Sequence, residues 1–400
     1  MYDFKLDDNQ KKALAFHLKN RWSFNCMNMG EGKTLTALEA MRQAKCDNIV
    51  IYCPAYLKEN WRSEIQKFYG TDYPHFKLLS YASKEKVDNY DGLILDEFHY
   101  LKSHTAQRTN RIYNHLYKVK PKMMVGLSGT PMKNTAFDFY TYFMMLSIKH
   151  KGVRMPRDPY AFQATFCRKI DNDFTPSGHS YEGINPERLD ELKSKIRPHF
   201  YFTPKQLRPI LPDVIEKKYM ANVRGNKVTL MQRAHDEGRS QEFMALKSLN
   251  ALSNTATTIK LINDLLYEGK RPVVFTEHRD SALAIAEKYK LKAIMGGVSA
   301  QARNYILKDF DNSISSVLIG TYGAMGSGLN IVSTDTMVFN DYCFSPSDYE
   351  QARKRIHRKG QNKTCYYHHV FANQLDYQIF KRLMTKRKES HEINKMETKS

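Results

Sequence analysis

A glycine-rich loop near the N-terminus contains the residue types that bind the phosphates of a nucleotide. It comprises Met29, Gly30, Glu31, Gly32, Lys33 and Thr34. The two glycines let the backbone bend and direct its N–H groups at phosphate oxygens, while Lys33 can reach the terminal phosphates and Thr34 can bind Mg²⁺. The outer glycine of the GxxxxGK[ST] pattern is absent, because Met27 stands in its place. A flexible glycine turn is the alternative, but a predicted strand before the loop and a predicted helix after it favour a phosphate site.

Two adjacent carboxylates end the apolar run of residues 93–95. Asp96 is placed to hold Mg²⁺, and Glu97 to orient and deprotonate the attacking water of a phosphohydrolase. On its own, a strand-end Asp-Glu pair is more often a turn with solvated carboxylates. Because this pair follows a phosphate loop along the chain, we interpret it as the second half of the same site.

A hydroxyl-bearing turn follows another apolar run, at residues 127–131 (LSGTP). Ser128 and Thr130 could relay the state of the nucleotide to a substrate. Together with His99, they are the residues that we expect to couple hydrolysis to substrate binding. An ordinary Gly-Thr-Pro turn is the alternative interpretation.

A basic segment near the C-terminus supplies a second set of candidate residues, at 351–358 (QARKRIHR). Arg355 and Arg358 are three apart, so on a helix their guanidinium groups would point the same way. One half of a nucleoside triphosphatase site therefore lies at each end of the chain. Two lobes that close on one nucleotide are typical of a motor rather than of a simple kinase.

The net charge of +20, from 62 basic and 42 acidic residues, indicates a polyanionic partner. A basic surface neutralises the phosphates of a nucleic acid. Charge alone does not distinguish DNA from RNA. A solvated, lysine-rich surface that only aids solubility is the alternative.

The remaining composition indicates a soluble intracellular protein, cytoplasmic or nucleoid-associated. No apolar run approaches membrane-spanning length, and residues 1–5 have no signal-peptide character. The six cysteines form no CxxC pair and no Cys/His cluster, so we expect reduced thiols rather than a zinc site or disulfides.

Alternating strands and helices predict the α/β elements that position these motifs. We expect strands at residues 23–27, 48–53, 76–79, 92–95 and 123–127, with helices at 7–20, 33–44, 56–68, 109–117 and 135–146. The alternation fails at 151–255, where eight prolines from Pro156 to Pro212 and many charges predict a helical or irregular insertion. It resumes with strands at 271–276, 292–294, 316–319, 337–339 and 364–371. The expected domains are therefore 1–150, 151–255, 256–380 and a charged tail at 381–400.

Several segments together resemble a superfamily-two helicase of the Swi/Snf-type branch. They are residues 54–64 (PAYLKENWRSE), 96–102 (DEFHYLK), 127–134 (LSGTPMKN), 320–330 (GTYGAMGSGLN) and 351–361 (QARKRIHRKGQ). The last is similar to the Q-A-x-x-R-x-H-R-x-G-Q motif, among the most specific of that branch. The resemblance covers about residues 4–380 and is closest to compact viral or bacterial members.

The resemblance implies two RecA-like parallel-sheet lobes that bind ATP and Mg²⁺ between them and nucleic acid across both. Gln10 would contact the adenine, and Gly328 and Gln351 would lie at the nucleotide. Arg355 and Arg358 would complete the site, with Arg358 stabilising the charge of the transferring phosphate. Backbone contacts to nucleic acid are expected from Ser80, Tyr81 and Thr321.

The function that we expect is an ATP-driven translocase that moves along or remodels duplex or forked DNA, acting as a monomer. A strand-separating or branch-migrating fork helicase is the nearest alternative. Others are an RNA helicase, the motor subunit of a restriction system, and a module that binds ATP without hydrolysing it. The presence of Glu97 and Arg358 disfavours the last of these.

Overall fold

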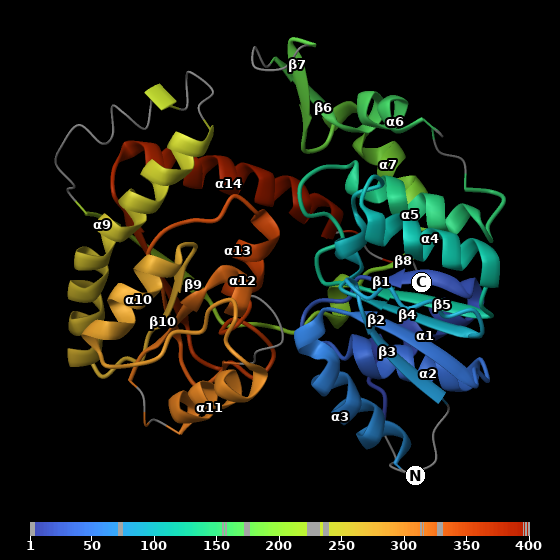
Figure 1. The fold of residues 1–400 in the computed structure, drawn as a ribbon, viewed down its shortest axis with the longest axis horizontal. Coiled ribbons are helices and arrows are strands. Elements are labelled where there is room, and N and C mark those ends of the chain that lie inside the picture. Colours follow the sequence, from blue (N-terminus) through green and yellow to red (C-terminus); the bar gives the residue numbers. More distant parts are fainter. Residues whose placement is uncertain are drawn as a thin grey trace. The chain divides into compact units, whose positions relative to one another are not determined.

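The computed structural model divides into two compact units (Figure 1). The first comprises Met1–Pro209 and Lys388–Ser400, and the second Ile210–Arg387. The structure describes residues 5–70, 75–153, 156, 158–171, 177–221, 233–234, 240–312, 314, 316–325, 331–394, 396 and 398. Each unit is built on its own parallel sheet, so the predicted α/β class with two sheets is confirmed.

The sheet of the first unit has the strand order β3-β2-β4-β5-β1-β8, and every described pairing in it is parallel. Its strands are β1 (Trp22–Asn25), β2 (Asn48–Cys53), β3 (His75–Ser80), β4 (Gly92–Asp96), β5 (Met123–Leu127) and β8 (Phe200–Tyr201). Parallel strands share one carboxyl edge, so the loops after β1, β4 and β5 begin at the same edge of the sheet.

Helices cover both faces of this sheet (Figure 1). They are α1 (Asp8–Asn20), α2 (Lys33–Gln43), α3 (Lys58–Tyr69), α4 (Gln107–Val119) and α5 (Asp138–Ser147), with short 3₁₀ turns η1 (Ala55–Leu57) and η2 (Phe98–Leu101). Ile94 of β4 shares a buried core with Leu38 of α2 and Trp61 of α3. Leu93 and Leu95 point to the opposite face and share a core with α4 and α5. A strand buried on both faces explains the continuous apolar run that precedes the two carboxylates.

The segment expected as an insertion contributes an edge strand to each sheet instead of standing apart. Within the first unit lie α6 (Pro159–Phe166), the antiparallel pair β6 (Arg168–Asp171) and β7 (His179–Glu182), η3 (Pro186–Arg188), α7 (Leu189–Ile196), β8 and η4 (Lys205–Leu207). In the second unit lie β9 (Val214–Met220) and α9, which begins at Ser240. β9 pairs with β13 at a sheet edge, and its exposed residues 216–218 are charged. Charged edge strands lack the apolar pattern by which strands are predicted.

The sheet of the second unit has the order β11-β10-β12-β13-β9, again with parallel pairings. Its other strands are β10 (Val273–Thr276), β11 (Leu318–Thr321), β12 (Thr336–Phe339) and β13 (Cys365–Phe371). The strand predicted at 292–294 is reduced to a single bridge between Ile294 and Gly320, so that prediction is wrong.

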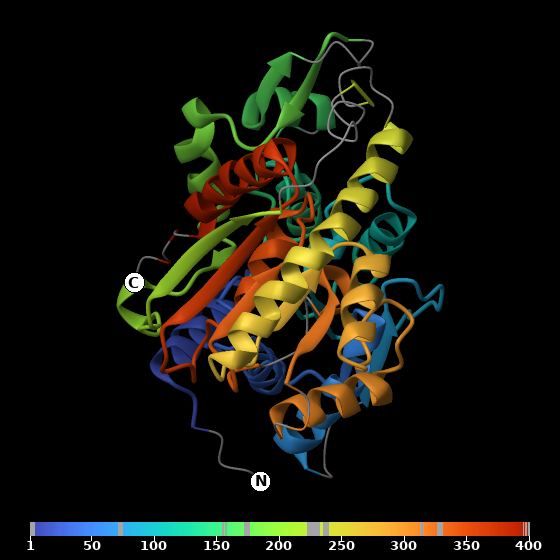
Figure 2. The same ribbon diagram turned by 90° about the vertical axis from the view of Figure 1, so that its left-hand side faces the viewer.

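Two layers of helices enclose the second sheet. α9 (Ser240–Tyr267) and α10 (Arg279–Lys288) pack on one face, and Figure 2 shows α9 running the length of it. The other face packs against α11 (Ala300–Asp311), α12 (Tyr322–Met325), α13 (Pro346–Arg353) and α14 (Gln374–Asn394).

Across the described parts of the chain, none of the helices is both long and apolar enough to cross a membrane. The six cysteines are buried free thiols.

Candidate active site

The glycine loop connects β1 to α2 and has a backbone that other residues would strain. Gly30 and Gly32 both have φ of +81°, in the left-handed region. A Cβ on Gly32 would also collide with the side-chain amide of Gln10. Gly32 is the N-cap of α2, whose first turn contains no acidic residue, so the positive end of the helix dipole faces the loop. This geometry is suited to an anion such as a phosphate.

The side chain of Glu31 holds the loop in shape from inside. Its Oε2 accepts hydrogen bonds from the backbone N–H of Asn28 at 2.9 Å, from Nδ2 of Asn9 at 3.4 Å and from the hydroxyl of Thr203. Only 7% of Glu31 is exposed. The expected nucleotide-binding residue Glu31 therefore has its carboxylate turned into the protein. Sequence reasoning missed Thr203, since nothing local connects it to a loop 172 positions away.

Lys33 and Gln10 bond to the loop backbone. Nζ of Lys33 donates to the carbonyls of Met27 and Asn28 at 3.0 and 2.9 Å. Oε1 of Gln10 accepts from the backbone N–H of Asp7 at 3.0 Å, as part of the capping box that begins α1, and its Nε2 donates to the carbonyl of Glu31 at 3.2 Å. Gln10 thus lies against the loop, as a residue beside the nucleotide would.

The carboxylate of Asp96 is held by two neighbouring motifs. The indole Nε1–H of Trp61 donates to its Oδ2 at 2.8 Å, and the hydroxyl of Tyr81 donates to its carbonyl oxygen at 2.8 Å. Burial, followed by the negative charge of Glu97, raises the pKa of Asp96 well above its usual range. Neither Trp61 nor the Tyr81 hydroxyl was predicted to contact the site, although Trp61 belongs to one of the segments that carry the resemblance.

Glu97 is the centre of a hydrogen-bonded group at the carboxyl ends of two adjacent strands. Its Oε2 lies 3.1 Å from Nδ1 of His99 and accepts from the hydroxyl of Ser128 at 3.3 Å. His99 and Ser128 lie 3.2 Å apart, and the backbone N–H of Thr130 donates to the Ser128 hydroxyl at 3.2 Å. Burial alone would raise the pKa of Glu97, but the hydrogen bond with His99 and the nearby positive charges lower it. The three expected coupling residues are therefore gathered at Glu97.

The residues at this edge fit a magnesium ion. Asp96 and Glu97 are half-buried neighbours, and the positive charge of Lys33 lowers the pKa of both, yet the pKa of Asp96 still rises. This chain's own groups thus leave the negative charge of Asp96 incompletely compensated, and a divalent cation would compensate it. Among the described residues, no group of three or more His, Cys, Asp or Glu side chains forms a metal cage. Mg²⁺ commonly keeps one or two protein ligands and takes the rest from water and substrate phosphates.

The basic motif of the second unit departs from its predicted conformation. The prediction that one helix carries both arginines is wrong, because α13 ends at Arg353. The N–H of Arg355 bonds to the carbonyl of Ala352 at 3.0 Å, which tightens the chain into a turn. Arg355 is buried at 1% exposure, whereas Arg358 is half-buried, and burial lowers its pKa.

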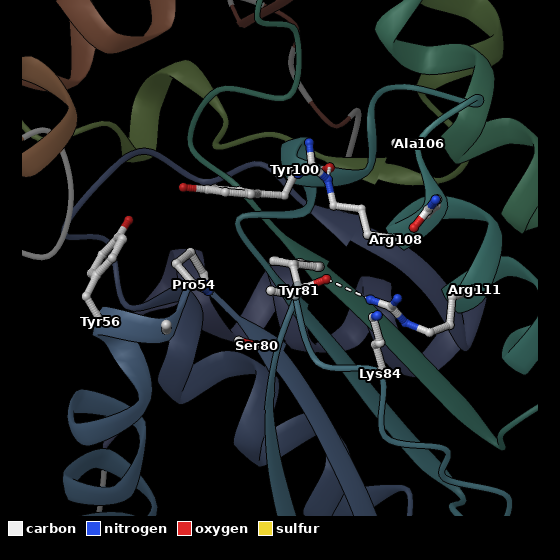
Figure 3. A pocket seen from close by; sticks show the side chains of 12 residues that line it. Pro54, Tyr56, Ser80, Tyr81, Lys84, Tyr100, Ala106, Arg108 and Arg111 are labelled. Atoms are coloured by element: carbon white, nitrogen blue, oxygen red, sulfur yellow. Dashed lines mark hydrogen bonds between the residues drawn. The ribbon is translucent and has the colours of Figure 1, made fainter. Parts of the chain in front are cut away.

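Four other predicted residues are placed as follows. Gln351 is buried in the last turn of α13, and Thr321 ends β11. Ser80 ends β3, while Tyr81 (Figure 3) is 4% exposed and its hydroxyl donates to the carbonyl of Asp96. Gly328 lies outside the described residues.

The chain is similar to known helicases over most of its length. A family model described as the helicase conserved C-terminal domain matches residues 256–360. An uncharacterized ATP-dependent helicase of Mycoplasma pneumoniae is 23% identical over 86% of this chain and 37% of its own length. The SWI/SNF-related matrix-associated actin-dependent regulator of chromatin subfamily A-like protein 1 homolog of Caenorhabditis elegans is 24% identical over 86% of this chain and 55% of its own length. The DNA annealing helicase and endonuclease ZRANB3 of Homo sapiens is 24% identical over 92% of this chain and 38% of its own length. This chain thus spans 37% to 55% of these relatives.

Among solved structures, the Sulfolobus solfataricus SWI2/SNF2 ATPase core in complex with dsDNA is 20% identical to this chain. The superposition has a TM-score of 0.43 and covers 96% of this chain and 92% of that one.

Proposed function

We propose that this chain, which is similar to ATP-dependent helicases and to SWI/SNF-related proteins over most of its length, couples ATP hydrolysis to movement along, or remodelling of, duplex or forked DNA. The observation that carries the proposal is the group of Glu97, His99 and Ser128 beside Asp96, at the sheet edge where the glycine loop begins. A phosphate loop, a cation-binding carboxylate and an ordered second carboxylate are the parts that phosphoryl transfer to water requires.

The candidate site residues of the first unit have separate roles in the proposed reaction. Lys33 exchanges its carbonyl partners for the terminal phosphates of ATP. Thr34 and Asp96 would hold Mg²⁺, which supplies charge neutralisation at the phosphates. Glu97 is ionised near neutral pH because its pKa is lowered, so it accepts a hydrogen bond from the attacking water and orients it. A carboxylate of low pKa is a weak base, so positioning the water is the larger part of its contribution.

The arginine motif of the second unit is proposed to act on the same nucleotide. Arg358 stabilises the charge of the transferring phosphate, and Arg355 and Gln351 support it. In this proposal ATP is a ligand that both units bind, and hydrolysis removes it. Alternate tightening and release on nucleic acid converts this cycle into steps.

DNA is the proposed track because of the charge of the chain and the relatives that it resembles. The net charge of +20 suits a phosphate backbone. The similarity over 92% of this chain to a protein described as a DNA annealing helicase and endonuclease is a second reason to propose DNA.

The test is the ATPase rate without nucleic acid and with single-stranded DNA, duplex DNA, forked DNA and RNA. Glu97→Gln is the negative control, expected to hydrolyse no ATP. Stimulation by duplex or forked DNA supports the proposal. Stimulation by single strands alone would indicate a conventional unwinding helicase, and stimulation by RNA alone an RNA helicase. ATP hydrolysis by Glu97→Gln at the wild-type rate would contradict the assignment of the active site.

A further inference from the structure

The edge strand β9 of the second sheet is long and regular. It pairs with β13 over seven consecutive residues without a bulge, and its sequence contains no proline. In Figure 2 it is the yellow-green strand beside β13, at the margin of the sheet. The strand at the opposite margin, β11, has only four residues and also bridges to Ile294. Many proteins shorten, bend or cover such edges, because their backbone groups can accept another strand.

The backbone groups of alternate β9 residues point away from the sheet. At the start of the parallel pairing with β13, the N–H of Cys365 bonds to the carbonyl of Asp213 at 2.9 Å. This bond fixes the alternation of the ladder, so the backbone groups of residues 215, 217 and 219 face β13. Those of Glu216 and Lys218 therefore face outward, as donors and acceptors for a further strand.

Two exposed lysines lie beside this edge, on the face of the sheet that α14 covers. Nζ of Lys218 lies 5.2 Å from the ring centroid of Tyr377 and donates to its hydroxyl at 3.4 Å. Nζ of Lys381 lies 4.8 Å from the centroid of the same ring. The carboxylate of Glu216, on this face too, lies 2.6 Å from the guanidinium of Arg353, so its charge is compensated within the chain. The two lysines make this face attractive to an acidic partner.

The opposite face of the edge suits apolar side chains better. Ile215 is 42% exposed there. Lys217 also projects on this face, because side chains alternate along a strand. Burial raises the pKa of Tyr219, and the nearby carboxylates of Asp264 and Glu268 raise it further. These carboxylates offset the charge of Lys217, so an apolar side chain beside Ile215 fits this face better than an acidic one.

Charge and backbone geometry together select the occupant of this edge. A second copy of the chain paired through β9 would bring two basic strands together, and like charges across adjacent strands repel. A nucleic acid offers phosphate oxygens, which only accept hydrogen bonds, so the outward carbonyls of Glu216 and Lys218 would stay unpaired. An extended acidic peptide meets both demands, because its backbone donates as well as accepts and its side chains carry the opposite charge.

We propose that β9 binds an extended acidic segment of a partner protein, which adds a further strand to the second sheet. Acidic side chains of the segment lie on the α14 face, against Lys218 and Lys381. The apolar side chains that alternate with them lie on the other face, against Ile215. The inference goes beyond the proposed function, since it concerns a protein partner and requires neither ATP nor nucleic acid.

Binding is tested with the full chain and a fluorescent peptide of the length of β9 in which Glu and Val alternate. Fluorescence anisotropy at low ionic strength should show saturable binding. Lys218→Glu combined with Lys381→Glu should weaken it about tenfold, because two attractive pairs become repulsive. Lys288→Glu combined with Lys308→Glu is the matched control and should bind as wild type does. It changes the net charge equally, at exposed lysines of α10 and α11, which contact β11 at the opposite edge of the sheet.

Strand addition is tested separately from charge with two N-methylated peptides, one methylated at the Glu positions and the other at the Val positions. Both keep every charge, but each lacks one alternate set of N–H donors. Methylation at Glu should weaken binding severalfold if the segment runs antiparallel to β9, and methylation at Val should do so if it runs parallel. If both methylated peptides bind as tightly as the parent, no strand is added and the proposal fails.

Amide hydrogen exchange, followed by NMR with saturating peptide, gives a readout at single residues. The N–H groups of Glu216 and Lys218 should exchange more slowly in the complex, because each gains a hydrogen bond. The N–H of Lys217 already faces β13 and should change least. Uniform protection of all three, or none, would contradict pairing at the outer edge of β9.

Unfolding temperatures check that every variant folds. Absence of saturable peptide binding by the wild-type protein would overturn the proposal, as would an equal loss of affinity in the variant that combines Lys288→Glu and Lys308→Glu. A DNA duplex that slows exchange at Glu216 and Lys218 when the peptide does not would assign the edge to nucleic acid instead. A concentration-dependent dimer that protects the same two N–H groups without peptide would assign it to a second copy of the chain.

Discussion

The indole N–H of Trp61 donates a hydrogen bond of 2.8 Å to the carboxylate of Asp96. Trp61 is 1% exposed in α3, and Asp96 ends β4, so a rigid buried ring fixes the orientation of a flexible side chain. Groups that hydrogen-bond to a metal ligand fix its orientation and strengthen its binding of the ion.

Replacing Trp61 by Phe should therefore weaken the use of Mg²⁺ while keeping most of the packing. The Mg²⁺ concentration that gives half-maximal ATPase rate should rise on the order of 10- to 100-fold. Direct titration of Mg²⁺–ATP binding gives a second readout. Trp22→Phe is the matched control, because the buried Trp22 indole donates to the carbonyl of Pro121 at 2.9 Å, away from the site. Identical Mg²⁺ dependence in the two variants would show that the Trp61 hydrogen bond has no such role.

Lys33→Ala should abolish ATP hydrolysis. The ammonium group is the positive charge that lies near both carboxylates, and residues 29–34 contain no other basic side chain to replace it. Its removal should cost on the order of a thousandfold in rate, since one preorganised charge in a phosphoryl-transfer site is worth that much. Steady-state phosphate release measures it, with Lys12→Ala, at an exposed position of α1, as the control. Normal turnover in Lys33→Ala would refute the site assignment.

The parts of the site that sequence predicts are those in which chemistry depends on residue type and local spacing. Gly32, Lys33 and Asp96 belong to this class, and the structure places each at the carboxyl edge of the first sheet. Local sequence patterns do not predict which distant segments of the chain contact each other. The inward turn of Glu31 depends on Thr203, and the charged strand β9 forms only because β13 lies beside it.

The end of α13 was missed for a related reason. The residues that follow Arg353 are good helix formers, so no local signal predicts a stop there. Instead Arg353 is anchored sideways, with Nη1 2.6 Å from Oε1 of Glu216 on β9, and the carbonyl of Arg353 accepts from the hydroxyl of Tyr367 at 2.8 Å. The same carbonyl accepts only a long hydrogen bond of 3.4 Å from the N–H of His357, so the bond that would continue the helix is weak here.

Two arginines of this motif should therefore respond differently to alanine substitution. Arg353 is 7% exposed and lies between Glu216 and the rings of Tyr349 and Tyr367. Arg353→Ala should reduce stability by about 1.5–3 kcal/mol, because it removes a buried guanidinium that donates to Glu216 and packs on two tyrosine rings. Arg358→Ala should leave stability close to wild type, keep ATP binding and slow hydrolysis on the order of a thousandfold.

Denaturant unfolding and single-turnover hydrolysis, measured on both variants, separate the two effects. An Arg353→Ala variant as stable as wild type would contradict the anchoring role. An Arg358→Ala variant that hydrolyses ATP at the wild-type rate would remove Arg358 from the proposed reaction.

Stability of the first unit should fall in mild acid because His17 is buried as a neutral side chain. Burial lowers the pKa of His17 to about 3 from 6.5, and its Nδ1 lies 2.8 Å from the hydroxyl of Ser23. Below pH 6.5 the unfolded chain binds a proton at His17, whereas the folded chain does not bind one there until about pH 3. The contribution is therefore complete above pH 6.5 and is lost as pH falls, at about 1.4 kcal/mol per pH unit.

Tryptophan fluorescence isolates this effect, since both tryptophans, Trp22 and Trp61, lie in the first unit. Urea unfolding between pH 5 and pH 7.5 should give a plot of unfolding free energy against pH that is shallower in His17→Asn than in wild type. The difference should correspond to about one proton. His75→Asn, at an exposed position of β3, is the control and should keep the wild-type slope. If His17→Asn keeps it as well, His17 takes up no proton on unfolding and is not held neutral by burial.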